Sequence, residues 1–442
     1  MNRTMLTRLL AALVAIAAVV VVLVVVLGGD DDNGNGNGGE VAGSEEVSGS
    51  LSMIGVWSAD EQRSFNAVLD GFREKYPNVT VRYTSAGDNT PTVLGTAVEG
   101  GRPPDLAAIA QPALVADFQE RGALQPMTFA QDAIRDNFPE DIAELGTIEG
   151  DIYSFVFKAA NKSTVWYNTQ LFEDAGVEPP EDFDGLIELA GTIKESGARA
   201  YSIGGADGWT LTDLFENVYL RQAGPERYDQ LTRHEIPWTD NSVKEALRTM
   251  ARILGDEDNI AGGTSGALQT EFPTSVSNVF ATNPRAAMVI EGDFVPGVVE
   301  TDLQPETDYN VFPFPDIGDS SNVVVGGGDS IVMFEDSPAA RALVEYLASA
   351  EAATIWAQRG GFSSANKNVS DDAYGNELTR RTATAIAAAE TFRFDMSDLA
   401  PASFGGTAGQ GEWKILQDFL RRPNSVDATA SALERAAARA YR

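Results

Sequence analysis

Apolar residues in the body of the chain alternate between the spacing of strands and the spacing of helices. LSMIGVWS (51–58) has the pattern of a buried strand, and a helical pattern of Phe65, Val68, Leu69 and Phe72 follows it. VTVRY (79–83) alternates as a second strand, and LAAIA (106–110) predicts a third after another helical stretch. This β-α-β-α-β order is typical of a parallel sheet covered by helices on both faces, so we expect an α/β fold.

Further strand patterns stand within a mostly helical remainder. They are VWYN (165–168), AAMVIEGD (286–293) and VVVGGGDSIVMF (323–334). Residues between 169 and 285 are rich in helix and turn patterns, and the chain from Ser337 onwards is mostly helical.

Polar and aromatic side chains follow the first and third predicted strands at their carboxyl ends. Trp57, Ser58 and Glu61 follow the first strand, and Gln111 follows the third. Open α/β sheets bind ligands at this edge, so these residues are candidates for a binding site. Trp57 has a second interpretation as an ordinary core residue. Asp105 precedes its strand, at the opposite end, and is expected to have a structural role.

The N-terminal segment predicts a membrane-directed leader. Residues 9–27 are wholly apolar, Arg3 and Arg8 precede them, and a Gly-, Asn- and Asp-rich stretch follows. The run is long enough to span a bilayer, so residues 1–27 are interpreted as an uncleaved signal-anchor, with a cleaved signal peptide as the alternative. Residues 28–50 are expected to be a flexible linker. Basic residues before the apolar run and acidic residues after it predict that the body lies on the extracytoplasmic side.

Charge and the rare residue types exclude several classes of site. The chain has 65 acidic and 32 basic residues, a net charge of −33, no cysteine and one histidine. So acidic a surface repels phosphate backbones, and nucleic acid is not expected as a partner. Thiolate chemistry is excluded, and a serine–histidine triad or a histidine-rich metal site could only be built around His234. No cofactor or metal is expected, and His234 is interpreted as a surface or structural histidine.

Eight segments in collinear order resemble the extracellular solute-binding proteins of ABC importers, family 1, of the sugar type that includes maltose-binding protein. The likeness is narrower to the alpha-glucoside-binding members, and it extends over roughly residues 51–435. The segments are FREKYPNVTVRY, GRPPDLAAIAQPALVADFQERGALQPM, KSTVWYNTQLFEDAG, GWTLTDLFENVYLRQAG, AAMVIEGDF, VVVGGGDS, YLASAEAATIWAQRGGFSSANKNV and FDMSDLAPASFGG. Many relatives carry a lipoprotein cysteine, which this chain lacks.

The resemblance implies a two-lobe, type II periplasmic-binding-protein-like fold with a ligand cleft between the lobes. The expected first lobe is 51–161 with 287–331, and the expected second lobe is 165–285 with 335–442. It also implies a monomeric receptor that captures a sugar, namely an alpha-glucoside oligosaccharide, and delivers it to the transmembrane subunits of an ABC permease. Trp166 and Tyr167 are expected to pack where the chain crosses between lobes.

Carboxylates, amides and aromatic rings suit sugar hydroxyls and C–H faces, and several segments supply them. Trp209 and Asp213 lie at a glycine-rich turn that opens a helix, although Asp213 has the alternative role of a helix cap. The resemblance implies an aromatic ligand contact at Phe294, a close approach of sugar at Gly292, and a hydroxyl contact at Asp329. The remaining candidates, partly from resemblance, are Glu291, Gly327, Gly328 and Phe362. Asp398 and Phe404 are further candidates, taken from the resemblance alone.

Two other functions share these features. A membrane-anchored glycoside hydrolase needs two carboxylates that flank a bond, and Glu61 with Asp213 or Glu291 is a candidate pair. A ligand-sensing receptor would use the same body with a different partner.

Overall fold

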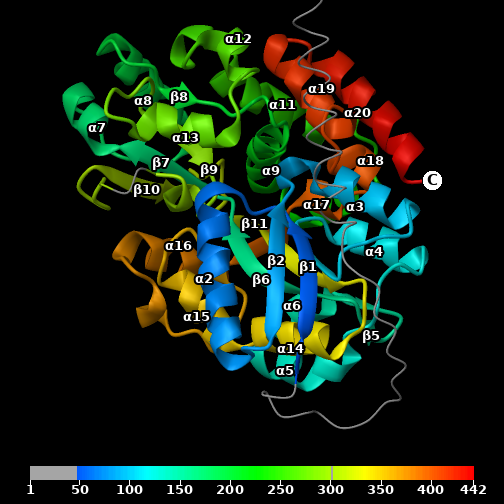
Figure 1. Ribbon diagram of the computed structural model, residues 1–442. Helices are drawn as coiled ribbons and strands as arrows, with labels where there is room; N and C mark the ends of the chain where they lie inside the picture. The colour runs from blue at the N-terminus through cyan, green and yellow to red at the C-terminus, as the bar shows by residue number, and fades with distance from the viewer. Residues whose placement is uncertain (1–46, 300–301) are drawn as a thin grey trace, which may run out of the picture.

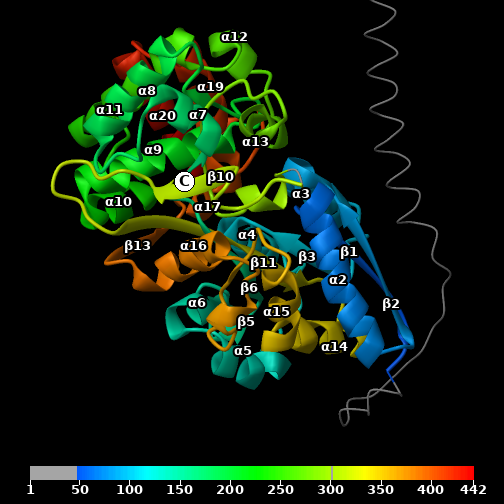
Figure 2. The ribbon, with the colours of Figure 1, turned by 90° about the vertical axis from the view of Figure 1, so that its left-hand side faces the viewer.

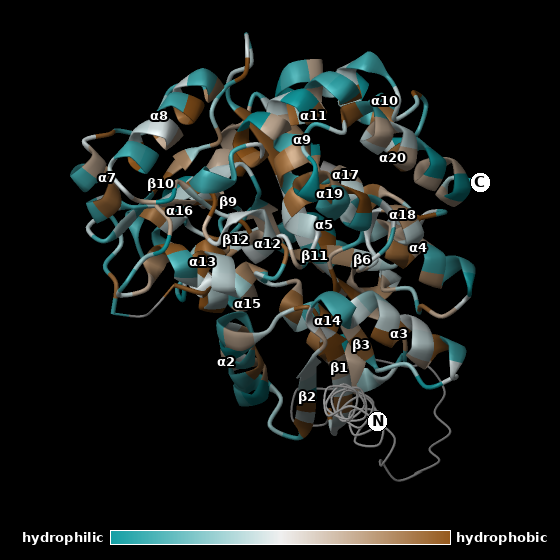
Figure 3. Cartoon of the chain, turned by 90° about the horizontal axis from the view of Figure 1, so that it is seen from above, coloured by the Kyte–Doolittle hydropathy of each residue, from teal (hydrophilic) through white to brown (hydrophobic). Residues whose placement is uncertain are grey.

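The computed structural model describes residues 47–299 and 302–442, and it confirms an α/β fold with two lobes, each built on its own sheet (Figure 1). The predicted leader, at 1–27, and all but the end of the predicted linker, at 28–50, lie outside these residues. Within the described ranges, no helix has the length and apolarity to cross a bilayer. Apolar colour concentrates on the strands and on inner helices, while outer helices carry much of the hydrophilic colour (Figure 3).

The sheet of the first lobe has seven strands, in the order β12-β6-β11-β3-β1-β2, with β13 paired to β11. β1, β2 and β3 are parallel, as predicted. β11 lies between β6 and β3 and is antiparallel to both, whereas it is parallel to β13. The strands are β1 (Gly49–Gly55), β2 (Val79–Ser85), β3 (Leu106–Ile109), β6 (Ser154–Asn161), β11 (Val323–Met333), β12 (Ser363–Ser364) and β13 (Thr391–Phe394).

Helices cover both faces of this sheet, which explains why β3 is fully buried. Met53 packs in a core with α2, α14 and α15, whereas its neighbour Ile54 packs in a core with α3 and α4 on the other face. The elements of this lobe are α2 (Ala59–Lys75), α3 (Thr90–Glu99), α4 (Pro112–Glu120), α5 (Gln131–Asn137), α6 (Glu140–Glu144), α14 (Pro338–Leu347) and α15 (Ala350–Ala357), with a small hairpin of β4 (Thr147–Ile148) and β5 (Asp151–Ile152).

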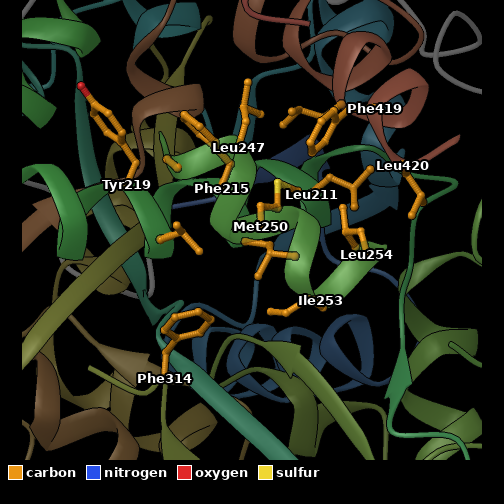
Figure 4. Packing of buried hydrophobic residues seen from close by; sticks show 14 of the residues in the cluster. Leu211, Phe215, Tyr219, Leu247, Met250, Ile253, Leu254, Phe314, Phe419 and Leu420 are labelled. Carbon is orange, nitrogen blue, oxygen red and sulfur yellow. The ribbon is translucent and has the colours of Figure 1, made fainter. Parts of the chain in front are cut away.

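The second lobe has a four-stranded sheet in the order β10-β7-β9-β8, surrounded by helices (Figure 2). Helix α9 is buried along almost its whole length, and Leu211, Phe215 and Tyr219 pack against α11 and α19 (Figure 4). The elements are β7 (Thr164–Asn168), β8 (Tyr201–Ser202), β9 (Met288–Glu291), β10 (Tyr309–Pro313), α7 (Thr169–Ala175), α8 (Phe183–Glu195), α9 (Trp209–Ala223), α10 (Pro225–Thr232), α11 (Asn241–Leu254), α12 (Gly263–Ala267), α13 (Phe272–Phe280), α17 (Met396–Leu399), α18 (Ala402–Gly405), α19 (Gly411–Arg421) and α20 (Val426–Ala440).

The chain crosses between the lobes at three places: between β6 and β7, between β10 and β11, and between β13 and α17. Helix α16 (Glu377–Ala388), which precedes β13, packs on β6, β11 and β12. Ser163, in the first crossing, accepts a hydrogen bond from the backbone N–H of Val325 at 2.9 Å, and its hydroxyl donates to Asn217 of α9. Arg221 of α9 donates to the carbonyl of Val323 at 2.6 Å. One helix of the second lobe therefore holds two crossings together.

The lobe boundaries expected from the sequence are corrected by the strand pairing. β9 and β10 both pair with β7, so 288–313 belongs with the second sheet, and only β11 of the predicted 287–331 segment lies in the first. Conversely, α14 and α15 of the predicted 335–442 segment pack in the core of the first lobe. The apolar face of a helix can pack on either sheet, and the sequence pattern of a strand does not indicate which strand it pairs with. The sequence alone therefore does not determine to which lobe these elements belong.

Alanine at position 105 is expected to destabilise the first lobe by about 1–3 kcal/mol. The Asp105 carboxylate accepts hydrogen bonds from the backbone N–H and the hydroxyl of Ser52, both at 2.7 Å, and its loss leaves that N–H without this partner. Urea unfolding measures the change, with Asp117→Ala on α4 as the exposed control. Equal effects of the two substitutions would contradict the structural role of Asp105.

Candidate functional site

Side chains from both lobes meet along the boundary between the two sheets, which we call the seam. The first lobe contributes the end of β1, the start of α2, and parts of β6 and β11. The second contributes the start of α9, the residues after β9, and α17, which packs against α4 of the first lobe. Two lysines, one buried and one with 11% of its side chain exposed, organise the charges at the seam.

Lys158, on β6, forms the centre of the Lys158 cluster with Glu61 and Asp329. Its Nζ lies 2.6 Å from Glu61 Oε1 and 4.0 Å from Asp329 Oδ2. Trp57 Nε1 donates a hydrogen bond to the same Asp329 oxygen at 2.6 Å. Burial opposes the charge of Lys158, but Glu61 and Asp329 outweigh it and raise the lysine pKa, so the ammonium stays charged.

Lys162, in the first crossing, forms the Lys162 cluster with Asp213, Asp395 and Asp398. Its Nζ lies 3.1 Å from Asp213 Oδ1 and 3.5 Å from Asp398 Oδ2, and it forms an ion pair with Asp395. A Cβ at residue 327 would lie 2.9 Å from Lys162 Cε, so Gly327 makes room for the lysine.

The carboxyls of the Lys162 cluster differ in their pKa. For Asp395, burial is outweighed by the charge of Lys162 and by hydrogen bonds, which lower its pKa to about 2. For Asp398, burial and the charge of Asp395 raise the pKa to about 8. Burial also raises the pKa of Asp213 well above its ordinary value, against the pull of Lys162. One lysine thus keeps one neighbour ionised and leaves others with a tendency to hold a proton.

Three aromatic rings gather beside these charges. Trp209, Phe272 and Phe294 lie 5.3–6.0 Å apart between ring centroids, and each is only partly buried. The ammonium of Lys158 lies 5.4 Å from the centroid of Phe294, and that of Lys162 lies 6.0 Å from the centroid of Trp209. These rings offer a part-exposed apolar surface between the two lysine clusters.

Several buried oxygens at or beside the seam have no hydrogen-bond partner among the described residues. They include Asp213 Oδ2, Glu291 Oε2, Asp293 Oδ1 and Gln111 Oε1. Glu291 also lines a small cavity between β8, β9 and α9, together with Ser202, Thr210 and Leu211. Buried acceptors without donors are costly, so the arrangement suits a molecule that brings donors.

Most of the candidates from the sequence come together at the seam. Glu61, Asp329 and Phe294 surround Lys158, and Asp213 and Trp209 lie by Lys162. Gly292 allows the ring of Phe294 to fold back over it, since a Cβ there would lie 2.3 Å from the ring, and Gly328 packs against Val156. Gln111 faces Gly406 of the second lobe, with Cγ 3.1 Å from the place of a Cβ.

Three candidates lie elsewhere, which corrects the expectation for them. Trp57 is fully buried among Phe65, Phe157 and Trp356, so its ring is core and only its N–H reaches the site. Phe362 is 2% exposed and stacks on Trp356 in the same core. Ser58 is exposed at the N-cap of α2, and no contact joins its side chain to either lysine cluster within the described part of the chain.

The sequence analysis missed both lysines and Phe272. Lys158 carried a usable signal, because it is the one charge in SFVFKAAN, a strand whose residues are all buried. A charged residue in such a strand predicts a paired site. Lys162 and Phe272 stand in polar, irregular sequence and carry no comparable signal.

The two backbones also touch directly at one point of the seam. A Cβ at Gly361, which has a φ of +63°, would lie 2.8 Å from the backbone nitrogen of Gly297. Gly297 follows β9 from the second lobe, and Gly361 precedes β12 in the first. Only glycine allows this approach.

Comparison with known proteins identifies relatives for most of the chain. Residues 58–354 match the family described as bacterial extracellular solute-binding protein. The osmoprotective compounds-binding protein GgtB of Synechocystis sp. is 32% identical over 85% of this chain and 90% of its own length. The alpha-glucosides-binding periplasmic protein AglE of Rhizobium meliloti is 31% identical over 86% of this chain and 85% of its own.

Solved structures share the fold. The bacterial solute receptor AcbH, described as having an exclusive preference for b-D-galactopyranose, superposes with a TM-score of 0.80 at 19% identity, over 90% of this chain and all of its own. The GacH receptor of Streptomyces glaucescens, solved unliganded and with acarbose, gives a TM-score of 0.69 at 19% identity, over 88% and 98%.

Replacement of Lys162 by methionine is expected to destabilise the protein by about 3–5 kcal/mol, because it leaves buried carboxylates without their cation. Lys414→Met is the matched control: its ammonium pairs with Asp418 on the surface, where an ion pair contributes at most about 1 kcal/mol. Chemical denaturation of both variants measures the difference. A Lys162→Met variant as stable as the control would refute the central role of this lysine.

Proposed function

Since the chain belongs to the bacterial extracellular solute-binding proteins, we propose that it binds an alpha-glucoside oligosaccharide and delivers it to an ABC permease. The family itself makes the chain an extracytoplasmic sugar-binding receptor of the ABC type, and not an enzyme. The hydrolase alternative is therefore not retained.

The observation that carries the proposal is the surplus of acceptor oxygens beside aromatic rings at the seam. Asp213 Oδ2 and Glu291 Oε2 are buried and lack donors among the described residues, and Trp209 and Phe294 expose part of their rings close by. A sugar ring supplies hydroxyl donors around its edge and C–H groups on its faces. One sugar ring can therefore donate hydrogen bonds to these oxygens and stack on the aromatic rings at the same time.

The two lobes contribute differently to this site. In the first lobe, Asp329 is already held by the N–H of Trp57, and Glu61 by Lys158, so their positions are fixed before a ligand arrives. In the second lobe, Asp213 and Glu291 keep an oxygen free. We assign the direct ligand contacts to Glu61, Asp213, Glu291 and Asp329, with Trp209 and Phe294 as stacking surfaces.

The choice of an alpha-glucoside rests on relatives. AglE is named for alpha-glucosides and GgtB for osmoprotective compounds, and both align with more than four fifths of this chain. Closure of the lobes around such a ligand follows from a site whose two halves come from different lobes joined by three crossings. The closed form is the state that a permease would recognise.

Maltose, trehalose or sucrose is expected to raise the thermal unfolding temperature, whereas amino acids and polyamines are not. A ligand at 100 times its dissociation constant stabilises the folded state by about 2.7 kcal/mol. Chromatography of the sugar afterwards should show no product. A shift with amino acids or polyamines alone would refute the substrate class while leaving the family unchanged.

Phe294→Ala is expected to weaken binding of the responsive sugar at least tenfold, which is about 1.4 kcal/mol, because it removes a stacking surface. Phe129→Ala is the matched control, since that partly buried ring packs near Arg341, away from the seam. Isothermal titration measures both. Equal affinity in the two variants would show that Phe294 does not contact the ligand.

A further inference from the structure

Buried carboxyl groups outnumber cations in the Lys162 cluster and the layer behind it. Asp213, Asp395 and Asp398 contact Lys162, and Glu216 and Glu412 lie beyond them, all at most 6% exposed. α9 also carries a buried cation, Arg221, but it donates to Asn217 and to the carbonyl of Val323, away from these acids. One lysine charge therefore faces five carboxyl groups.

Such a cluster is stable only if some of its members are neutral, because a buried charge without a partner is very costly. Glu216 is well satisfied, since it accepts hydrogen bonds from Tyr228 and from the backbone N–H groups of Met396 and Ser397. By contrast, both oxygens of Glu412 and Oδ2 of Asp213 have no partner among the described residues. Protons are the simplest way to neutralise groups of this kind.

The cluster lies at the boundary between the lobes, next to the crossings. Lys162 is in the first crossing, and α17, which carries Asp398, packs on α4 of the first lobe as well as on α9 and α10 of the second (Figure 1). Of the three carboxyls that contact Lys162, Asp398 is the farthest, at 3.5 Å, and its side chain keeps 8% exposure. Opening of the lobes would hydrate it first, and closure buries it again.

We propose that closure of the lobes takes up a proton at Asp398, so that this receptor binds its ligand more tightly at acidic than at alkaline pH. The inference rests on the proposed function for its ligand and for the closure of the lobes.

The groups that face Asp398 support this direction. They are Lys162 in the crossing, Asp213 on α9, Asp395 before α17 and Asp329 on β11. Glu216, Glu412 and Tyr228 lie in the layer behind, around Asp395. On α4, Gln111 at the N-cap is uncharged, Asp117 pairs with Arg121 on the outside and Glu120 is exposed. α18 (Ala402–Gly405) has no ionisable side chain. Around Asp398, carboxyl groups outnumber the single lysine, which favours the protonated form of Asp398.

The sign follows from the pKa of Asp398. With the lobes as they stand in this structure, burial and Asp395 raise the pKa of Asp398 to about 8, whereas a hydrated carboxyl has an ordinary value of 3.8. Between pH 3.8 and about 8, Asp398 holds a proton in the closed form and not in the open form. The resulting stabilisation of the closed form is complete below the ordinary pKa of a carboxyl and is lost as the pH rises through about 8. Affinity for the ligand therefore falls by up to tenfold per pH unit within this range.

Isothermal titration of the full-length chain with trehalose and maltose at pH 6 and pH 8 tests this. We expect at least tenfold weaker binding at pH 8, and a binding heat at pH 7 that changes with the ionisation enthalpy of the buffer, as proton uptake requires. Asp398→Asn should lose most of this pH dependence, whereas Asp117→Asn should keep it. Equal affinity at both pH values, or an unchanged slope in Asp398→Asn, would overturn the inference.

A ligand-free measurement separates this inference from the choice of sugar. The chain has no cysteine, so Glu74→Cys on α2 and Glu245→Cys on α11, both exposed, accept a dye pair that reports the distance between the lobes. Without ligand, energy transfer should shift towards the closed form from pH 8 to pH 6. If neither sugar binds but the shift occurs, the substrate is wrong and the proton uptake stands. No shift in energy transfer would refute the proton uptake.

Discussion

The buried charge of Lys162 is the constraint on which the rest of the structure depends. It sits in the first crossing between the lobes and gathers carboxylates from α9 and from the segment around α17, which are distant in sequence. Gly327 makes room for it, and Asn217 of α9 donates to its backbone carbonyl at 2.8 Å. Because a buried ammonium needs these partners, the crossing, the helix and the C-terminal segment must fold together.

The second lysine has a more local role. Lys158 fixes Glu61, while the N–H of Trp57 fixes Asp329, so the half of the site on the first lobe is prepared in advance. The half on the second lobe holds oxygens that still lack donors. In the proposed site, a ligand would therefore meet one half that is already held in place and one half that gains its hydrogen bonds only on contact. The hydrogen bonds that the oxygens of the second lobe would gain from the ligand favour closure of the lobes.

Local sequence patterns predicted the order of strands and helices at the start of the first lobe, but not how distant strands pair. The β-α-β-α-β order and the structural role of Asp105 follow from spacing and from position along a strand, which are properties of neighbouring residues. The insertion of β11 between β6 and β3, and the pairing of β9 with β7, depend on contacts over more than a hundred residues. Trp57 shows the same limit: its place in the sequence suggested the cleft, but Phe65, Phe157 and Trp356 enclose its ring.

The contact between Gly297 and Gly361 has a consequence for how this receptor could vary. The two backbones meet without side chains between them, and a side chain at position 361 would require them to move apart, because its Cβ would lie 2.8 Å from the backbone nitrogen of Gly297. At position 297 a Cβ would make only ordinary van der Waals contacts with Glu61 and Gly361. A substitution at Gly361 would therefore favour the open arrangement of the lobes without replacing any side chain assigned to the ligand, so the strength of binding can change while the choice of ligand stays the same.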